Sequence, residues 1–391
     1  MRRPLSLLLA LFCSFPLAAQ DTLTAQGSKS FRIGTWNLEF LGAAGNFRND
    51  MPPRTDADYT AIGKKVAELG VCILAVQEIN DEDTLKKVAA GAGPAWTALL
   101  GTSGGWDDGK TAQHIGFLWD RAAVELLFAE ELLQLPRQFE GQPIFHRVPV
   151  TACWKHKASG CDFRLVTVHL KAGQKAQDEQ KRRGEAQALA GWLDALADAP
   201  NEDPDVVLLG DFNSTYGAEP EALFERSHHR RYLHPRTPSP TIMHFADPID
   251  QVVVADGCRE VRQDSFTVHS DFAGLSKDAW RQTYSDHFPV VITLVANGDD
   301  DPQATFARGG PEQALPRALP GTPTPAPAPD RGAVWPPKLG QSIRVLVAGT
   351  LYVNGKLAAP LPEGPGGWVV IAETSGLRAI PWSQVLTLQL Q

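Results

Sequence analysis

The strongest constraint on the fold of this chain is a series of short apolar segments, rich in β-branched residues, that recurs between residues 31 and 295. Stretches with the periodicity of an amphipathic helix separate several of them, as in Asp56–Leu69 and Gln174–Leu196. Because strands and helices that alternate in this way pack in layers, we predict one large α/β domain. The expected strands are Phe31–Leu38, Val71–Ile79, His114–Trp119, Phe163–Leu170, Val206–Leu209, Ile249–Val254 and Phe288–Val295.

The composition changes abruptly after Ala296. The following stretch contains Thr322–Pro329, in which every second residue is proline. Such a segment cannot build a packed core and is typical of an extended spacer. Strand-like alternation then returns near the end of the chain. We therefore predict a large domain over residues 28–297, a Pro/Ala-rich linker over 298–340 and a small β-rich module of unknown role over 341–391.

The N-terminus, residues 1–19, resembles a secretory signal peptide. Arg2 and Arg3 precede the apolar stretch Leu5–Phe15, and small residues follow up to Ala19. A membrane anchor is the alternative, but this stretch is too short for a bilayer, which needs about 20 residues. We expect a secreted or periplasmic protein without a transmembrane segment.

Export makes the cysteines informative, because disulfides form in oxidising compartments. Cys153 and Cys161 flank a segment typical of a turn between two strands, and we predict a disulfide between them. A zinc site that includes His156 would need a second pair of ligands at the usual spacing, which the sequence lacks. Cys72 lies in an apolar run and is expected to be a buried free thiol.

The chain is acidic, with 37 Lys and Arg against 45 Asp and Glu and a formal net charge of −8. A polyanionic partner must therefore be met by a local basic patch or by a bound cation. Lys171, Arg230 and Arg231 lie in basic stretches that follow two predicted strands, and they are our candidates for substrate binding. The alternative is that these stretches are a solvated loop and a solvated helix face.

Polar residues that could bind a ligand or take part in catalysis fall at or near the ends of the predicted strands. Asn37 follows an apolar run and would suit a strand-end turn, a phosphate or a metal-bound water. Glu78 ends another apolar run, and an unpaired buried charge is costly. It therefore needs a cation partner, which could be a basic side chain or a metal. His169 lies inside a predicted strand, where a single histidine is more often structural than catalytic.

Three further motifs occur later in the chain. Asp211 and Asn213 follow Gly210 at the end of one strand, Asp250 precedes another, and Asp286-His287 precedes the last. Each motif alone is typical of an ordinary turn. Together with the earlier residues they place carboxylates, amides and histidines at successive strand ends, where α/β proteins present functional groups.

In this order, the residues resemble the endonuclease/exonuclease/phosphatase superfamily over about residues 31–295. The resemblance implies a four-layer sandwich of two packed mixed β-sheets flanked by helices. It also implies a metal-dependent phosphoric ester hydrolase. The metal-site residues that it implies are Asn37, Glu78 and Asp286, and the implied catalytic residues are His169, Asp211, Asn213, Asp250 and His287.

The resemblance also implies a role for each catalytic residue. His169 would contact the scissile phosphate and protonate the leaving oxygen, while Asp211 and Asn213 would orient the attacking water and the phosphate. Asp250 would pair with His287, and either His287 or Asp211 would take a proton from water. All-oxygen ligands favour Mg²⁺, Mn²⁺ or Ca²⁺ over zinc, and we expect Mg²⁺.

Two motifs, Gly210–Asn213 and Ser285–Val290, are most similar to secreted deoxyribonucleases and related bacterial nucleases. We therefore expect a monomeric exported endonuclease for which DNA or RNA is the substrate, with a C-terminal module that is a candidate for binding a surface or polymer. One alternative is a sphingomyelinase-like or other lipid or small-molecule phosphoesterase on the same fold. A second is a non-catalytic binding protein that retains the fold, although its buried carboxylates would then be destabilising without a cation.

Overall fold

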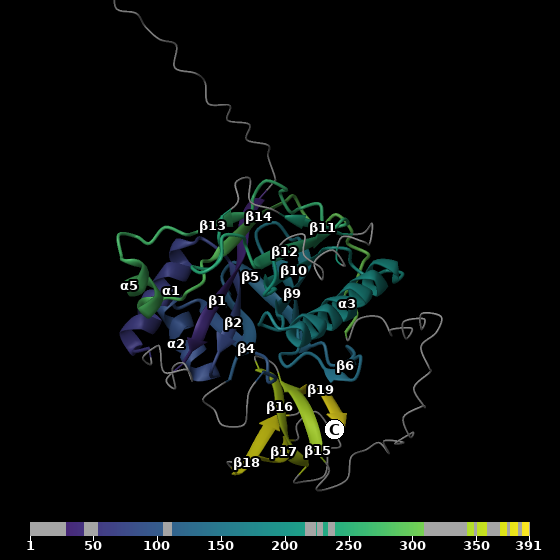
Figure 1. The fold of residues 1–391 in the computed structure, drawn as a ribbon. Coiled ribbons are helices and arrows are strands. Elements are labelled where there is room, and N and C mark those ends of the chain that lie inside the picture. Colours follow the sequence, from purple (N-terminus) through teal and green to yellow (C-terminus); the bar gives the residue numbers. More distant parts are fainter. Residues whose placement is uncertain are drawn as a thin grey trace, which may run out of the picture.

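The computed structural model describes residues 29–42, 54–104, 112–215, 224, 230–233 and 239–308, and the backbone of the strands between residues 342 and 390. The expected signal peptide and most of the expected linker lie outside these residues. Figure 1 shows the large domain with its helices on two opposite sides and the C-terminal strands in yellow.

The first sheet has six strands in the order β13-β14-β1-β2-β4-β3. Its centre is built from β1, which runs parallel to β2 and antiparallel to β14. The sheet is therefore mixed, as expected. Its strands are β1 (Lys29–Leu41), β2 (Ile73–Ile79), β3 (Trp96–Leu100), β4 (His114–Asp120), β13 (Thr267–Val268) and β14 (Val290–Ala296).

The second sheet also has six strands, in the order β11-β12-β10-β9-β8-β5. Here β9 and β10 are parallel neighbours, and β12 pairs with β10 in the antiparallel sense. Its strands are β5 (Val124–Glu131), β8 (Val150–His156), β9 (Asp162–His169), β10 (Val206–Asp211), β11 (Arg230–Leu233) and β12 (Asp250–Ala255). The short pair β6 (Gln138–Phe139) and β7 (Gln142–Pro143) stands apart from both sheets.

Helices cover the outer face of each sheet (Figure 1). The apolar faces of α1 (Asp56–Glu68) and α2 (Glu82–Ala92) share one core cluster with residues of β1, β2 and β4. The long helix α3 (Ala176–Asp198) shares another with β9, β10 and β12. The short α5 (Lys277–Thr283) adds Trp280 to the first of these clusters.

A third core cluster lies between the two sheets and combines residues of both, such as Ile33 and Phe117 from the first and Trp154 and Phe163 from the second. Both faces of each sheet are buried, so the side chains on both faces of a strand are apolar. This explains the continuous apolar runs in the sequence. The architecture is therefore helix, sheet, sheet, helix, and the predicted four-layer sandwich is confirmed.

The large domain extends further than residue 297. Residues up to Arg308 return to the body, where the Ala307 carbonyl accepts a hydrogen bond from Arg164 Nη2 at 2.9 Å and Thr305 pairs with Glu202. Residues 298–308, which the composition assigned to the linker, thus contact the large domain, because a composition shift does not reveal packing. Within residues 342–390 the backbone forms five antiparallel strands, β15 (Ser342–Val347), β16 (Thr350–Leu357), β17 (Trp368–Glu373), β18 (Gly376–Pro381) and β19 (Val385–Leu390).

The predicted Cys153–Cys161 disulfide is wrong, because both residues are free and buried. The strand pair that they flank does exist, but its register places Cys153 opposite Arg164 and not opposite Cys161. Cys161 belongs to the core between the sheets, as does Trp154, the strand neighbour of Cys153. Since successive side chains of a strand alternate between faces, Cys153 points to the other face. Cys72 is a buried free thiol, as expected.

Among the described residues, no helix is long and apolar enough to cross a membrane.

Candidate active site

The predicted site residues come together at one edge of the sandwich. His169 and Asp211 end the parallel strands β9 and β10 and are register partners, and Asp250 at the start of β12 is opposite Asp211. Parallel strands place their last residues at the same sheet edge, so side chains distant in sequence become neighbours. Asn37 and Glu78 reach this edge from β1 and β2 of the facing sheet.

Unusual backbone conformations mark the ends of these strands. Glu78 and Asn213 have positive φ angles of 60° and 52°, and Glu39 and Phe40 in β1 have 47° and 49°. Left-handed backbone is uncommon for residues other than glycine and costs free energy that the surrounding structure must offset. In β1 it coincides with a register shift between Asn37 and Leu41. The local distortion ends regular pairing at the edge where the polar side chains gather.

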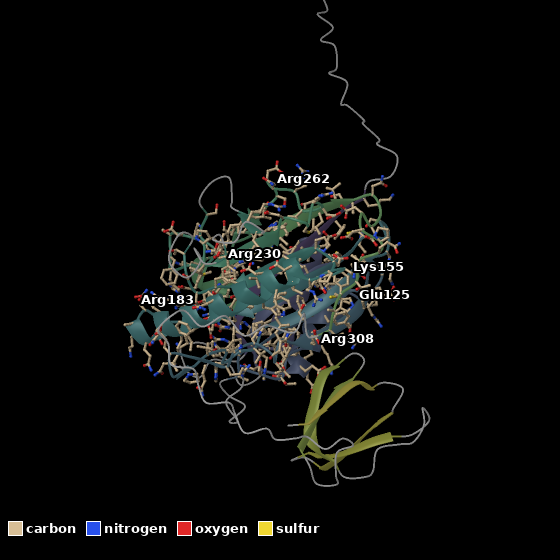
Figure 2. All side chains as sticks on the ribbon, turned by 90° about the vertical axis from the view of Figure 1, so that its right-hand side faces the viewer. Glu125, Lys155, Arg183, Arg230, Arg262 and Arg308 are labelled. Atoms are coloured by element: carbon tan, nitrogen blue, oxygen red, sulfur yellow. The ribbon has the colours of Figure 1, made fainter. Side chains whose placement is uncertain are left out.

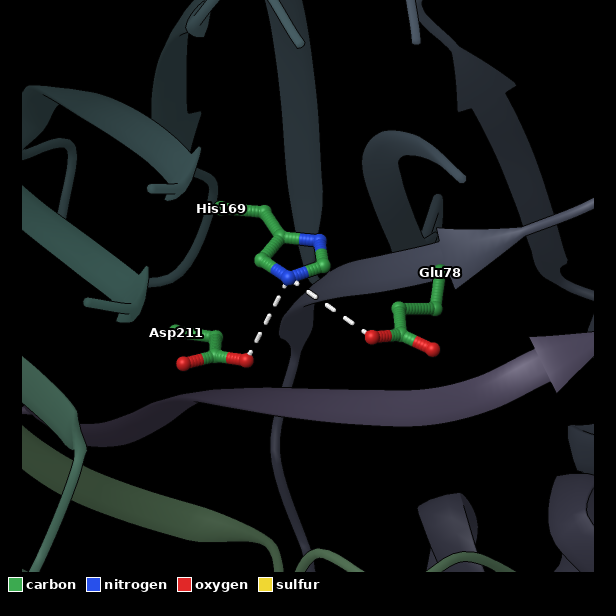
Figure 3. Close-up of side chains that lie close together, drawn as sticks. All are labelled: Glu78, His169 and Asp211. Atoms are coloured by element: carbon green, nitrogen blue, oxygen red, sulfur yellow. Dashed lines mark ion pairs between the residues drawn. The ribbon is translucent and has the colours of Figure 1, made fainter. Parts of the chain in front are cut away.

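Glu78, His169 and Asp211 form the centre of the site (Figure 3). His169 Nε2 lies 3.6 Å from Glu78 Oε1 and 3.5 Å from Asp211 Oδ2. The Asn37 side-chain amide donates to the same two carboxylates at 3.2 and 2.9 Å, and its own oxygen accepts from the Glu39 amide at 3.0 Å. In this orientation the Asn37 amide nitrogen links two acids, and its oxygen accepts the Glu39 amide.

His287 forms a pair with Asp250, with 2.8 Å between Nδ1 and the carboxylate. Its other nitrogen lies 3.8 Å from Asp211 Oδ2 and 4.0 Å from Asp286 Oδ1. Burial alone would lower the pKa of His287, but the carboxylates of Asp250, Asp211 and Asp286 together raise it well above its ordinary value. This histidine is therefore held in its charged form with Nε2 directed toward Asp211.

The other site histidine has the opposite tendency. Burial, together with the positive charges of Arg147 and His287, lowers the pKa of His169 well below its ordinary value. Burial also raises the pKa of Asp211 to about 7, although His287 and Asn37 oppose this change. The edge thus holds a neutral histidine, a charged histidine and a carboxyl group that titrates near neutrality.

Asn213 is fixed behind Asp211. Its backbone amide donates to Asp211 Oδ1 at 2.8 Å, and its side chain donates to the Leu170 carbonyl at 3.1 Å. The neighbouring Gly210 is required by close packing, since a Cβ there would lie 2.1 Å from the Val168 carbonyl oxygen. These contacts hold the strand end of Asp211 in one position.

Sequence reasoning missed a group of ionic residues around Asp286. Glu39 is 5% exposed, accepts from the Asp286 amide at 3.0 Å and from Arg281 Nε at 2.8 Å, and lies 3.8 Å from Arg54. Burial and the nearby Asp286 raise the pKa of Glu39 to about 7. Its position two residues after Asn37 was the available signal. Arg281 had none, because it lies in a short helix far along the chain.

Arg147 is a second residue that the sequence did not reveal. It is buried, and its guanidinium donates at 2.9 Å to the backbone carbonyls of both His169 and Leu170. It therefore supports the loop after β9 from behind and places a positive charge close to Glu78 and Asp211. Nothing in its sequence neighbourhood distinguishes it from an ordinary loop arginine.

The edge opens into a cavity of about 940 Å³. Its lining includes Glu78, Asp211, Asp286 and His287, whereas the buried His169 and Asp250 are not among the lining residues. Basic side chains also line the cavity, so an anion that enters would meet positive charge as well as carboxylates. These basic residues are Arg137, His146, Arg147, Lys171, Lys181 and Arg281.

Only one of the three predicted substrate-binding residues lies at this cavity. Lys171 lines it, whereas Arg230 and Arg231 belong to the outer strand β11 and do not. Arg230 is buried against α3, where it donates to the Ala190 carbonyl at 3.2 Å. Its position is labelled in Figure 2. Arg231 donates to the carbonyls of Ala255 and Cys258. Both guanidinium groups are occupied by structural contacts, which a run of basic letters cannot show.

The residues of this edge fit a hard divalent cation. Glu78, His169 and Asp211 each place one atom within 4.8 Å of the others, and Asp286 lines the same cavity. Burial and the neighbouring Asp286 raise the pKa of Glu78, which means that its negative charge is poorly compensated by the protein alone. Oxygen donors of this kind suit Mg²⁺, Mn²⁺ or Ca²⁺.

The chain combines a two-sheet sandwich with carboxylates, histidines and basic side chains at one edge. This arrangement suits the hydrolysis of phosphoesters. The sequence profile of the Endonuclease/Exonuclease/phosphatase family matches residues 34–287, and the chain belongs to this family. Members of this family are hydrolases that act on phosphoester bonds and generally use divalent metals.

Individual relatives agree with this assignment. Human endonuclease/exonuclease/phosphatase family domain-containing protein 1 is 24% identical over 302 residues, which are 71% of this chain and 51% of that protein. A deoxyribonuclease from Thioalkalivibrio sp. (strain K90mix) is 27% identical over 195 residues, which are 46% of each. The chain thus spans about half the length of the curated relatives it matches.

A solved structure shows the same fold. The endonuclease/exonuclease/phosphatase protein from Bacteroides vulgatus superposes with a TM-score of 0.50 at 19% identity, covering 68% of this chain and 98% of that one.

Proposed function

We propose that the large domain is a divalent-metal-dependent phosphodiesterase that hydrolyses nucleic acid by in-line attack of water, and that it acts as an endonuclease outside the cytoplasm. The observation that carries this proposal is the cavity lined by Glu78, Asp211 and His287 together with basic side chains, with His169 buried in contact with Glu78 and Asp211. The likeness to a deoxyribonuclease supports the choice of nucleic acid, and the N-terminal sequence supports export.

Glu78 and Asp286 would hold the cation, which we take to be Mg²⁺, with Asp211 close by. When bound, such an ion neutralises phosphate charge and polarises the phosphoryl group, so that a nucleophile can approach. Glu39, which contacts Arg54 and Arg281, accepts a hydrogen bond from the backbone amide of Asp286. It would thereby fix the position of Asp286.

The protein residues divide the proton transfers between them. Asp211 is the better base, because its carboxyl group titrates near neutrality while His287 is already charged. His287, fixed by Asp250, would stabilise negative charge on the phosphoryl oxygens as the water attacks. His169, whose pKa burial lowers, would donate a hydrogen bond to the phosphate, and water in the open cavity would supply the proton that the leaving oxygen needs.

The substrate must be a polyanion or a small phosphodiester that fits the basic wall. Lys171, Lys181 and Arg137 line the cavity and would contact phosphates of a nucleic acid strand. A lipid substrate would need an apolar surface around the entrance for the acyl chains. The basic lining residues favour nucleic acid, while the apolar lining residues Ile144, Phe145 and Ile242 make a lipid the alternative that the assay must test.

The test is hydrolysis by the purified full chain, with plasmid DNA, RNA, sphingomyelin and a simple aryl phosphodiester as substrates. Each is assayed after chelation with EDTA and after addition of Mg²⁺, Mn²⁺ or Ca²⁺. We expect plasmid or RNA cleavage at internal positions that EDTA abolishes and Mg²⁺ restores. A preference for sphingomyelin would establish the lipid alternative, and no hydrolysis of any substrate would favour a binding protein.

A further inference from the structure

A second cluster of acidic residues lies at the opposite end of the same strands. Asp205 immediately precedes β10, and six residues of extended chain separate it from Asp211, a distance of about 20 Å. Asp203 precedes it, Glu260 follows β12, and Asp301 follows β14. These four acids, Asp203, Asp205, Glu260 and Asp301, are called the distal cluster. They are separate from the candidate active site around Glu78, Asp211 and His287, which is called the catalytic edge.

The carboxylates of the distal cluster face one another. Asp203, Asp205 and Asp301 each place an oxygen within 4.8 Å of the others, and Asp205 forms a second such group with Glu260 and Cys161. Asp203 and Asp205 are both 2% exposed. Carboxylates brought this close repel one another strongly unless a cation lies between them.

Several of these oxygens are buried without a hydrogen-bond donor. Asp205 Oδ1 and Glu260 Oε2 have no partner, although their residues are only 2% and 7% exposed, and neither oxygen of Asp301 has one. Buried polar atoms are nearly always hydrogen-bonded in proteins, so unpartnered acceptors that converge on one point indicate a missing ligand. In the absence of a cation, protonation keeps Asp203 and Asp205 neutral. A bound cation would instead satisfy the oxygens in their ionised form.

In the described part of the chain, the basic side chains near the distal cluster are paired with other acids. Lys155 lies 3.9 Å from Asp162 and Arg259 lies 3.8 Å from Asp300, both at the margin of the distal cluster. Arg164 is occupied by Glu202 at 2.8 Å. Within the described part of the chain, no lysine or arginine forms an ion pair with Asp203, Asp205, Glu260 or Asp301.

We propose that Asp203, Asp205 and Asp301, with Glu260 beside them, bind a structural Ca²⁺ ion. Carboxylate oxygens from separate chain segments suit Ca²⁺, which accepts six to eight oxygen ligands in flexible geometry, whereas Mg²⁺ demands a stricter octahedron. The Cys161 thiol beside Asp205 and Glu260 is a soft sulfur donor and therefore a poor ligand for a hard ion.

The bound ion would fasten the end of the domain. Asp301 lies in the segment 299–308, which is otherwise held by a few hydrogen bonds, such as Asp203 N to the Thr305 carbonyl at 3.0 Å and Ala307 N to Glu202 at 2.9 Å. Coordination by Asp301 together with Asp203 and Asp205 would link this segment to the start of β10. Because only the folded chain gathers these ligands, Ca²⁺ would stabilise the fold.

The test compares Asp301→Asn with Asp198→Asn in the full chain, after EDTA treatment and dialysis. Asp198 is an exposed acid at the end of α3 and is the matched control. Two quantities are measured, the shift in unfolding temperature on addition of millimolar Ca²⁺ and the number of Ca²⁺ ions bound per chain by equilibrium dialysis. A ligand present well above its dissociation constant should raise the unfolding temperature of a domain this large by about 5 °C.

We expect Asp301→Asn to bind one Ca²⁺ fewer than the wild type and to lose most of the temperature shift, while Asp198→Asn keeps both. Glu78→Gln, which alters the catalytic edge, should also keep the distal ion and its stabilisation. Equal Ca²⁺ binding by Asp301→Asn and the wild type would overturn the proposal. So would binding of Zn²⁺ without Ca²⁺. Because Asp301 lies in a partly exposed loop, its variant decides the question even if Asp205→Asn does not fold.

Discussion

The two ends of the central strands carry similar residues in different surroundings. β9 begins at Asp162 and ends at His169, β10 runs from the neighbourhood of Asp205 to Asp211, and β14 separates His287 from Asp301. At the catalytic edge, each acid has a polar partner from the protein. At the distal cluster, acids face acids.

The electrostatic result differs accordingly. Burial raises the pKa of Asp211 only to about 7, because His287, Asn37 and the Asn213 amide oppose the effect. Burial and the neighbouring Glu260 raise the pKa of Asp205 to about 10, since its close neighbours are other acids. The comparison shows that histidine and amide partners limit the rise in the pKa of Asp211, whereas the neighbouring acids increase the rise in the pKa of Asp205.

The largest expected effect concerns the catalytic edge alone. His287→Ala should lower turnover of a phosphodiester by roughly a hundredfold or more, because the charged imidazole and its pair with Asp250 are both lost. Initial rates with saturating Mg²⁺ measure this. Asp301→Asn is the control at the other end and should keep near-normal turnover. Unchanged hydrolysis by His287→Ala would remove this residue from the mechanism.

Salt should affect the catalytic edge strongly. If Lys171, Lys181 and Arg137 each neutralise one phosphate, the binding constant for DNA should fall by about fortyfold between 50 and 200 mM salt. Binding to a labelled oligonucleotide in Ca²⁺ over a salt series gives the slope. Lys171→Ala should reduce that slope by about one, while Arg230→Ala should leave it unchanged, since Arg230 faces α3. A salt-independent affinity would argue against a nucleic acid substrate.

The dependence of stability on pH should expose the distal cluster. The folded-state pKa values of Asp203 and Asp205 are raised to about 8 and about 10, far above those of an unfolded chain. Such acids stabilise the fold when protonated, so in EDTA the unfolding temperature should fall as the pH rises from 5 toward 9. The charged groups that face them are Asp162, Glu260, Asp299, Asp300 and Asp301, with Lys155 and Arg259 at the margin.

Calcium should reverse that trend, because ionised carboxylates bind the cation better than protonated ones. Thermal unfolding followed by circular dichroism, with and without Ca²⁺ at each pH, provides the measurement. A fall in unfolding temperature that is the same with and without Ca²⁺ would show that no ion compensates these acids.

The smallest effect on turnover is expected from shortening the chain. Truncation after Arg308 should preserve hydrolysis and the Ca²⁺-dependent stabilisation, since the residues of the candidate active site and of the distal cluster all precede that position. Truncation after Ala296 should preserve the catalytic residues but remove Asp301, and with it the Ca²⁺ response. Loss of hydrolysis in the longer variant would show that residues beyond 308 contribute to the reaction.

Much of the large domain could be predicted from the sequence. The apolar runs and their polar ends indicated seven of its strands, two helices and the residues of the catalytic edge, because strand burial and strand-end chemistry are local properties of the chain. The helix α2 and the strands β3, β5 and β8 were not predicted separately. Their patterns are short, and long-range packing determines them.

Other features depended on contacts that no local pattern reports. The strand register decided that Cys153 and Cys161 lie apart, and the packing of β11 against α3 made Arg230 structural. Arg147 and Arg281 reach the catalytic edge from loops and a short helix with no motif.

The sequence by itself indicated the family, the layers and the acids and histidines that gather at one sheet edge, since those depend on residue type and order. Only the tertiary structure decided which charges neighbour which. It gave Asp211 polar partners and left Asp205 among other acids, because the energy of a buried charge depends on what surrounds it in space.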